Sequence, residues 1–579
     1  MTNPNIIKNL QLNMTRLLQL TAMLLVASSL SAQTIDLNNL DEKKKLKLSG
    51  GLSAGMIGYA GNSMANRNPY TWNVAGNLNL RILETIDIPV SMNISNANRE
   101  LKVPNTPSRL SIHPTYKGVT AHIGDVNMTY SPYSLNGHQF TGVGVEIAPQ
   151  KRKFRYSAMG GKFQQAVEYD SAFSNQLAAY ERWGYGGKVQ FVQDIFDIGL
   201  NVFTAKDREN SLVTQPDTFG IVPQQNLVGT VDLAFRPFKG FEIKTEFAMS
   251  ALTQDIRDQS EVVERTSGMF NLVFPENNST AYYTAQKISM NYQKKTNQIG
   301  VGYEKIDPGY RTLGAYFFAN DLENITLNLG KVMMKNKLSV FARGGIQRDD
   351  LDGNKAGANQ RFVGSLNTNF TPNERFNLGV NYSNFRTFMR IKSQFQFINQ
   401  LNQYQALDTF NFTQISQNLN INSTYVLKQK DSLSHSLIAN LGLQDVYAEQ
   451  GGNEQPGGSN TFYNVSLAHA FQNNRSNVDI VTGYFYTHNM VSEDKFITQG
   501  PSLTVGKKLF KKAMRISASV NYNNTSSSNS AIDPVNVINS RVSLSVRMKK
   551  SHNLSLSAMQ QNRGSDVSQI GSISYYFTF

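Results

Sequence analysis

Apolar and polar residues alternate along most of this chain, in segments of about ten residues. The segments 376–383 (FNLGVNYS), 514–523 (MRISASVNYN) and 541–549 (RVSLSVRMK) each place apolar side chains at every second position. Successive side chains of a strand point to opposite faces, so each segment has one apolar and one polar face. A period of two argues against amphipathic helices. The segment length is that of a tilted strand crossing a bilayer.

The connections between these segments alternate in length. Turns such as 117–118 (KG) and 294–297 (KKTN) are short, whereas 205–226, 449–460 and 523–536 are long and polar. Outer-membrane barrels join their strands in this way, with short periplasmic turns and long extracellular loops. We therefore expect an all-β fold, a transmembrane antiparallel up-and-down β-barrel of about 26 strands (24–26), located in the outer membrane.

The ends of the chain are expected to lie on the same side of the membrane. The first connection, near 62–70, and the last, near 561–568, both read as long loops. With an even number of strands, this arrangement predicts that both termini are periplasmic.

A soluble, secreted protein made of several sandwich domains is the main alternative, because sandwich strands also alternate. Such domains are usually separated by linkers, and we find none. The chain has no cysteine, which removes disulfides, thiol catalysts and cysteine metal sites, and it carries 33 Phe and 25 Tyr but only 2 Trp. After the N-terminal region, no run approaches the 18 apolar residues of a membrane helix. The pattern favours the barrel.

The N-terminus reads as a secretory signal peptide. Lys8 and Arg16 precede a short apolar run (17–26), and small residues follow up to Ala32. We expect cleavage after Ala32, with a cut after Ser31 as the alternative, and translation could begin at Met14. The predicted organisation is a signal peptide (1–32), a short periplasmic segment (33–45) and an outer-membrane barrel (46–579).

The last nine residues, GSISYYFTF, carry on one face Ile573, Tyr575, Phe577 and Phe579. This segment resembles the C-terminal strand by which the outer-membrane assembly machinery recognises its clients. The Ala32–Gln33 junction resembles signal cuts common in Bacteroidota exports. Residues 119–170 resemble a stretch of large, poorly characterised Bacteroidota outer-membrane barrels, porin-like or secretion-associated. The resemblance implies a location and a fold, and it implies no catalytic residues.

No constellation of catalytic or cofactor-binding residues stands out. His113 and His122 fall on neighbouring predicted strands and His138 in the next loop, but no carboxylate stands beside them at ligand spacing. Scattered histidines of this kind more often line a lumen than hold a metal. Gly142 and Gly144 lie in a strand with no helix after it, so we read them as barrel-packing residues rather than a phosphate loop. We expect no enzyme, no cofactor and no metal.

The short turns are strongly basic. Lipid phosphates beside these cations would stabilise each contact by about 1 kcal/mol. A ring that docks an acidic periplasmic partner or an anionic cargo is the sharper alternative, and nucleic acid is not expected in this compartment. The basic periplasmic rim comprises Lys117, Lys151, Arg152, Lys153, Lys239, Lys294, Lys295, Lys335, Lys337, Lys428, Lys430, Arg475, Lys511, Lys512, Lys549 and Lys550.

The expected size bears on function. Twenty-six tilted strands make a ring roughly 50 Å across, too wide to stand open in the outer membrane. Residues 33–45 are too few to form the plug of a TonB-dependent transporter. Either inward-folded loops, with 205–226, 256–279 and 389–408 as candidates, or a periplasmic or surface protein must occlude the lumen.

Three functions follow from this reasoning. The first is a conduit or assembly platform for a secreted or surface protein. The second is a diffusion porin narrowed by its own loops and favouring anions, because lumenal arginines such as Arg515, Arg541 and Arg547 are expected on several strands. The third is a surface anchor or adhesin without transport. Fold alone does not separate them.

Overall fold

A computed structural model of the chain describes residues 46–61, 69–83, 85–96, 108–149, 152–169, 178–213, 221–258, 274–316, 319–353, 360–384, 412–430, 432–450, 453–454, 460–491, 494–549 and 551–579. The predicted signal peptide (1–32) and the segment 33–45 lie outside these ranges.

Nearly all described residues belong to strands. One short 3-10 helix, Glu209–Ser211, interrupts a loop. Within the described ranges, no helix has the length and hydrophobicity needed to span a membrane. The strands are β1 (Leu46–Gly61), β2 (Tyr70–Ile82), β3 (Ile86–Ser95), β4 (Arg109–Ile112), β5 (Thr115–Tyr116), β6 (Val119–Thr129), β7 (Asn136–Ile147), β8 (Phe154–Gln164), β9 (Arg182–Val192), β10 (Phe196–Asp207), β11 (Gln225–Phe235), β12 (Phe241–Thr253), β13 (Thr280–Lys294), β14 (Asn297–Ile306), β15 (Leu322–Met333), β16 (Leu338–Arg348), β17 (Gln360–Asn373), β18 (Phe376–Ser383), β19 (Phe412–Lys430), β20 (Leu433–Gln450), β21 (Asn453–Glu454), β22 (Asn460–Asn473), β23 (Val478–Val491), β24 (Asp494–Leu509), β25 (Met514–Ser527), β26 (Val535–Met548), β27 (His552–Arg563) and β28 (Asp566–Thr578).

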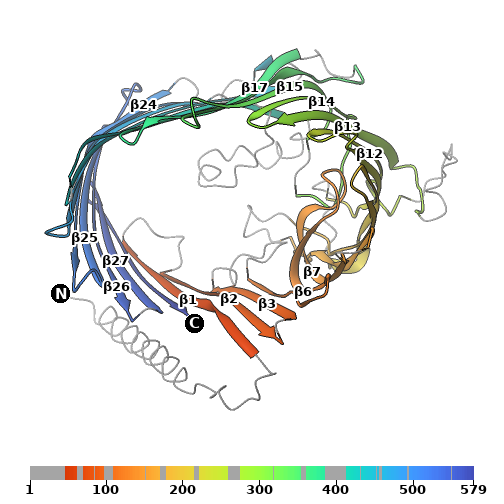
Figure 1. Ribbon diagram of the computed structural model, residues 1–579, viewed down its shortest axis with the longest axis horizontal. Helices are drawn as coiled ribbons and strands as arrows, with labels where there is room; N and C mark the ends of the chain where they lie inside the picture. The colour runs from red at the N-terminus through yellow and green to blue at the C-terminus, as the bar shows by residue number, and fades with distance from the viewer. Residues whose placement is uncertain are drawn as a thin grey trace.

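The sheet closes on itself as an up-and-down barrel (Figure 1). Consecutive wall strands pair antiparallel, and β28 pairs with β1, where Gly50 and Phe579 exchange two backbone hydrogen bonds of 3.1 Å. β4 and β5 are halves of one wall strand, since both pair with β3 and β6, and the two-residue β21 only extends β20. The described residues thus form a closed antiparallel wall of 26 strands, which confirms the predicted fold.

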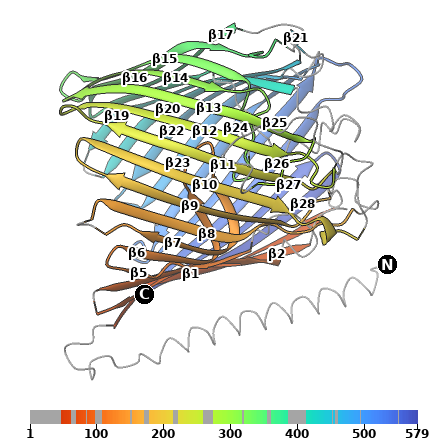
Figure 2. The ribbon, with the colours of Figure 1, turned by 90° about the vertical axis from the view of Figure 1, so that its right-hand side faces the viewer.

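The strands slant across the wall, as Figure 2 shows from the side, and their alternation sorts residues between two faces. On β10, Ile198, Leu200 and Val202 point outward, whereas the intervening Asn201 and Phe203 are buried inside the barrel. The same alternation gives β26 an outward Val542 beside Ser543 and Arg541 on the other face. The outer wall is therefore apolar, which is the surface that lipid chains solvate best.

Aromatic rings mark both edges of this apolar band. At the end of the barrel that carries Phe579, outward rings pair next to the short turns. These pairs are Phe154–Phe191, Phe238–Phe241, Phe370–Phe376 and His552–Phe577. Toward the opposite end, the exposed outward rings include Trp183, Tyr185, Tyr463, Tyr484 and Tyr522. Aromatic girdles at two interfaces are typical of membrane barrels. The chain is an integral outer-membrane β-barrel that crosses the bilayer with its strands.

The connections are less regular than the sequence predicts. Arg563 and Asp566 pair directly, so the expected long last connection is a two-residue turn, Gly564–Ser565, with Gly564 at φ 57°. The prediction of a long loop near 561–568 is wrong, because its polar residues continue the strands beyond the apolar band. For the same reason β19 and β20 reach 19 and 18 residues, well beyond the expected ten.

Candidate functional site in the barrel lumen

The C-terminal strand lies at the closing seam. Its alternate residues Ile573, Tyr575 and Phe577 face outward, with Ile573 opposite Met56 of β1 and Leu556 of β27. The ring of Phe577 also packs against that of Phe579, with the two ring centroids 5.3 Å apart. The predicted apolar face is thus the outer face of the last strand, and its recognition by the assembly machinery stays a prediction.

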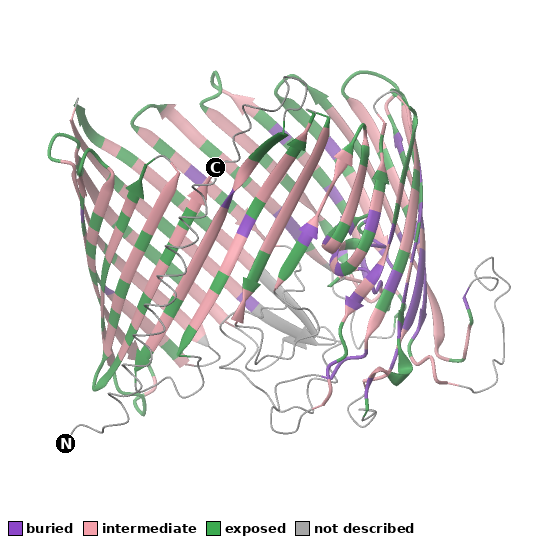
Figure 3. Cartoon of the chain, turned by 90° about the horizontal axis from the view of Figure 1, so that it is seen from below, coloured by how far each residue is buried: buried purple, intermediate pink, exposed green. Residues whose placement is uncertain are grey.

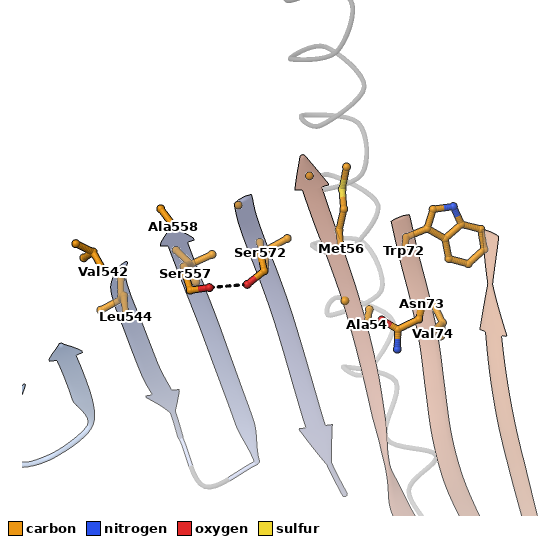
Figure 4. Close-up of a pocket in the computed structure, with 15 residues that line it drawn as sticks. Ala54, Met56, Trp72, Asn73, Val74, Val542, Leu544, Ser557, Ala558 and Ser572 are labelled. Carbon is orange, nitrogen blue, oxygen red and sulfur yellow. Dashed lines mark hydrogen bonds between the residues drawn. The ribbon is translucent and has the colours of Figure 1, made fainter. Parts of the chain in front are cut away.

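The outer wall is hollowed at this seam (Figure 4). Small residues, among them Ala54, Gly58, Ala558 and Gly571, lie between larger apolar side chains of β1, β2, β26, β27 and β28. The hollow belongs to the lipid-facing surface, so an acyl chain is its ordinary occupant.

The turn cations lie together at one end of the barrel. Every described member of the predicted rim belongs to a turn or strand end on the same side as Phe579, whereas Lys151 and Lys550 lie outside the described residues. Lys117 lies over the Tyr116 ring, 5.0 Å from its centroid. Whether this end is periplasmic, and what the rim contacts, stay predictions.

Several of these turns use left-handed backbone conformations. Lys117, Lys295, Lys335, Lys511 and Lys549 all have φ between 48° and 55°. Type I′ hairpin turns require positive φ because their twist then matches that of the paired strands. These lysines therefore shape the turns as well as charging them.

Buried residues gather on one side of the lumen, as the purple patches of Figure 3 show. They belong mainly to β6–β15 and to the loops between these strands. Two apolar clusters form this inner layer: one centres on Leu135, Phe140, Phe163 and Phe203, the other on Tyr133 and Tyr310. One side of the barrel thus carries a second layer of packed side chains inside the wall.

The segment 130–135 (YSPYSL), which we call the inner loop, joins β6 to β7 and attaches to the lumenal wall. The Tyr133 hydroxyl donates to Oε1 of Glu304 over 2.6 Å, and Ser131 Oγ donates to Oε1 of Glu246. Lys188 Nζ donates to the Tyr130 carbonyl at 2.7 Å. The loop is therefore fixed to three separate wall strands, β9, β12 and β14.

The segment 307–316, which we call the supporting loop, holds the inner loop from the other side. Tyr310 OH donates to the Tyr133 carbonyl and Thr312 Oγ1 to the Ser134 carbonyl, both at 2.8 Å. Asn136 N donates to the Gly314 carbonyl at 2.9 Å. A Cβ on Gly314 would lie only 2.7 Å from both Phe203 and the Ser134 carbonyl, so this close approach requires glycine.

Burial keeps the loop tyrosines protonated. Burial raises the pKa of Tyr130 to about 12 and also raises the pKa of Tyr310. Burial, followed by the nearby Glu304 carboxylate, raises the pKa of Tyr133. All three hydroxyls can therefore serve as hydrogen-bond donors at neutral pH.

Glu246 and Glu304 belong to a longer set of polar lumenal side chains, which we call the polar row. Its members stand directly opposite one another on successive strands from β11 to β17, and neighbours interact, as at Lys287–Glu304 (3.5 Å) and Gln347–Asn324 (2.7 Å). The polar row comprises Asp232, Glu246, Lys287, Glu304, Asn324, Gln347 and Arg361.

The lumenal face of the remaining wall is mostly uncharged. Rows of amides and hydroxyls cross it, such as Asn367, Asn381, Asn420 and Asn464, and Ser517, Ser543, Ser557 and Ser572. The Asp479 carboxylate on this face binds Arg515 through two hydrogen bonds of 2.7 and 2.6 Å. The two halves of the lumen thus differ: one is charged and covered by the inner layer, whereas the other carries mostly amides and hydroxyls, with a few arginines among them.

Neither the inner loop nor the supporting loop was predicted from the sequence. The predicted occluding loops were 205–226, 256–279 and 389–408. The last, with parts of the other two, lies outside the described residues. Tyr133 and Leu135, two apolar residues within a short polar turn, were a signal that this loop packs against something.

Histidines come together more closely than the sequence indicates. His113 Nδ1 lies 2.9 Å from His122 Nδ1, and His122 Nε2 lies 3.3 Å from Oε2 of Glu146. A carboxylate therefore does stand beside this pair, contrary to the expectation. Across the described ranges, no group of three His, Asp or Glu residues is placed to hold a metal ion. Gly142 and Gly144 lie in β7, where a Cβ on Gly142 would lie 2.3 Å from the Gly160 carbonyl.

No family model and no curated protein sequence matches the chain. Many solved structures are similar to it, among them the following three. The P pilus usher translocation pore is 10% identical, with 92% of this chain and 99% of that chain covered and a TM-score of 0.36. The ferric enterobactin receptor of Pseudomonas aeruginosa is 11% identical, with 93% and 81% covered and a TM-score of 0.41. OccAB3 of Acinetobacter baumannii is 9% identical, with 66% and 98% covered and a TM-score of 0.28. The likeness to Bacteroidota barrels stays a prediction.

Proposed function

We propose that this barrel acts in transport across the outer membrane, as a conduit or assembly platform for a secreted or surface protein. The observation that carries the proposal is the width of the wall together with the one-sided inner layer. Twenty-six strands enclose a ring roughly 50 Å across, whereas the buried inner residues of the described chain gather mainly along β6–β15. A small solute needs no wall of this size.

The chemistry of the second lumenal wall supports the same proposal. A polypeptide in transit presents amide and carbonyl groups, which side-chain amides and hydroxyls can bind transiently without a large desolvation cost. A carboxylate there, Asp479, is already neutralised by Arg515. This wall of amides and hydroxyls would therefore hold a passing chain weakly.

Matched cysteines test this proposal, because the chain has no cysteine of its own. Ser543→Cys places a thiol on the lumenal face of β26, and Val542→Cys places one on the adjacent outer face. With a short cleavable thiol crosslinker in growing cells, we expect Ser543→Cys to capture a discrete protein and Val542→Cys to capture none. No protein captured from Ser543 or from other lumenal positions such as Asn381 and Asn464 would contradict the proposal.

A diffusion pore that prefers anions is the second candidate function. Arg541 and Arg547 lie on the lumenal face of β26. One contact is described for the Arg541 guanidinium, with Met559 Sδ at 3.5 Å. Cations lining a pore raise the local anion concentration. This candidate predicts a steady anion-selective conductance that Arg541→Ser and Arg547→Ser lower together. Arg515→Ser would leave the Asp479 carboxylate unpaired and add a negative charge to the wall.

The basic rim suggests a further contact for either function. We propose that its lysines bind phosphate groups of the lipid leaflet beside them, with a contribution of about 1 kcal/mol each. Docking of an acidic partner is the alternative. Replacing Lys511 and Lys512 by Glu tests the two: loss of a crosslinked partner without loss of barrel assembly supports docking, and weaker binding of anionic vesicles supports lipid contact.

A further inference from the structure

The hairpin of β6 and β7 leaves the barrel wall before its strands end. Among the described residues, the ladder between β4 and β6 stops where Ser111 faces Gly124, although both strands continue. The ladder between β7 and β8 stops where Thr141 faces Lys162. Beyond these two points, β6 and β7 still pair with each other. The hairpin therefore stays intact while its neighbours part from it.

The end of this hairpin lies over the lumenal face of other strands. Tyr130, directly after β6, donates its hydroxyl to the Gly186 carbonyl of β9 at 3.3 Å, and Lys188 of the same strand donates to the Tyr130 carbonyl. Val126 and Phe140, on the lumenal side of the hairpin, are buried in the inner layer. The upper part of β6 and β7 thus lies inside the barrel and does not extend the wall.

The outer face of the hairpin is apolar only next to the short turns. Its outward apolar residues are Val119, Ala121, Ile123, Val143, Val145 and Ile147. On β3 and β9 the outward residues are apolar at every second position from Ile86 to Ile94 and from Trp183 to Phe191. A strand tilted by about 40° rises roughly 2.6 Å per residue across the membrane. The apolar band is therefore about 10 Å tall on β6 and β7, and about 20 Å tall on β3 and β9.

Hydrogen-bonding side chains lie directly above this short band. The Asp125 carboxylate accepts from Thr141 Oγ1 at 2.6 Å and from the Leu110 amide at 2.9 Å. Asn127 Nδ2 donates to the Gly137 carbonyl at 2.9 Å. Thr141 and Asn127 are exposed. The outer face of the hairpin thus changes from apolar to polar between Val143 and Thr141.

A short apolar band determines how lipid arranges beside it. A bilayer adapts to a protein surface of insufficient apolar height by becoming thinner, and polar side chains at membrane depth draw water toward them. Both conditions hold on β6 and β7. Because the band regains its height on β3 and β9, the effect is confined to one side of the barrel.

We propose that the outer face of β6 and β7 is a membrane-thinning site, at which water and lipid headgroups reach down to Asp125, Asn127 and Thr141. The partner of this surface is the lipid bilayer itself, in the leaflet at the end opposite Phe579. The lumenal side of the hairpin stays dry, since Val126 is buried there, so the site does not open the lumen. The proposal is independent of the transported cargo.

A fluorescent thiol label tests how far water reaches along this surface, because the chain has no cysteine. Val202 of β10 is the fourth outward residue counted from its short turn, as Thr141 is on β7, and it provides the matched control. Thr141→Cys and Val202→Cys of the full-length barrel are labelled with bimane in phosphatidylcholine vesicles. We expect iodide in the buffer to quench the label at Thr141, and lipids brominated near the chain ends to leave it bright. The label at Val202 should behave in the opposite way.

Two results would overturn the proposal. Quenching of the Thr141 label by brominated chains, without an effect of iodide, would mean that acyl chains cover the polar face. A label that neither agent quenches would mean that protein covers it. Heat-modifiable migration in gels checks that each variant folds. If Thr141→Cys does not fold, Gln139→Cys at the next outward position of β7 provides the same comparison.

Discussion

The phenolic hydroxyl of Tyr133 donates a 2.6 Å hydrogen bond to Oε1 of Glu304, although 171 residues separate them in the sequence. The bond joins the inner loop to a strand of the wall. The backbone carbonyl of the same tyrosine accepts a hydrogen bond from Tyr310 of the supporting loop. Tyr133 is therefore a residue at which the wall, the inner loop and the supporting loop meet.

Removing this one hydroxyl should loosen the inner layer and leave the barrel intact. A hydrogen bond to a charged group contributes about 1.5–3 kcal/mol, so Tyr133→Phe should speed local opening about 10- to 150-fold. Hydrogen exchange of residues 130–136 and 308–314 measures this directly. Tyr156→Phe, at an outward-facing position, is the matched control. Unchanged protection in Tyr133→Phe would mean that apolar packing and the other hydrogen bonds hold the loop without this one.

Alkaline pH should also release the inner layer. Burial raises the pKa of Tyr130 to about 12 and raises the pKa of Tyr310, while an exposed tyrosine ionises near pH 10. The protonated tyrosines therefore make their full contribution to the free energy of unfolding below about pH 10. This contribution is lost as the pH rises through the folded-state pKa. Ultraviolet absorbance of tyrosinate should show a late component that Tyr130→Phe diminishes. Ionisation of every tyrosine in one step near pH 10 would contradict this expectation.

Neighbouring residues on β26 should respond oppositely to a new charge. Val542 faces lipid and Ser543 faces the lumen. Near the bilayer midplane a lysine on the lipid face costs about 2–4 kcal/mol, and a lumenal lysine stays hydrated. Urea unfolding in vesicles should therefore show a clearly lower free energy of unfolding for Val542→Lys and little change for Ser543→Lys. Equal losses would mean that the two faces are assigned wrongly.

The two ends of β25 provide a test of orientation in the membrane. Ser530 lies in the connection after this strand and Lys512 in the turn before it. If both termini are periplasmic, a membrane-impermeant maleimide on intact cells should label Ser530→Cys and spare Lys512→Cys. After the outer membrane is permeabilised, both should react. The reverse pattern on intact cells would place the termini outside.

Much of the wall could be predicted because its signal is local. Alternation at Val542 and Ser543, or at Leu200 and Asn201, can be read from adjacent residues, since a strand presents them to opposite faces. The limits of strands were harder to predict. Around Gly564 the polar residues resemble a loop, yet they continue two paired strands beyond the apolar band.

The lumenal site could not be predicted in the same way. Nothing near Tyr133 in the sequence indicates Glu304. Nothing near His122 indicates that Glu146, on the next strand, will lie beside it. These contacts depend on the register between strands and on which loops fold inward. A period-two pattern of apolar residues predicts neither the register nor the inward loops. The rim lysines are the intermediate case, because every second connection of an antiparallel barrel lies at the same end.

We propose that another protein occupies this lumen during function. Planar-bilayer conductance of the barrel purified in mild detergent tests it most directly, with mass spectrometry of the same sample. We predict a stoichiometric second protein in the sample, and no steady conductance until that protein is removed. A sample that contains this chain alone could instead show a steady, anion-selective conductance, with the same value after mild and after harsh detergent. That result would contradict the proposal and favour the diffusion pore.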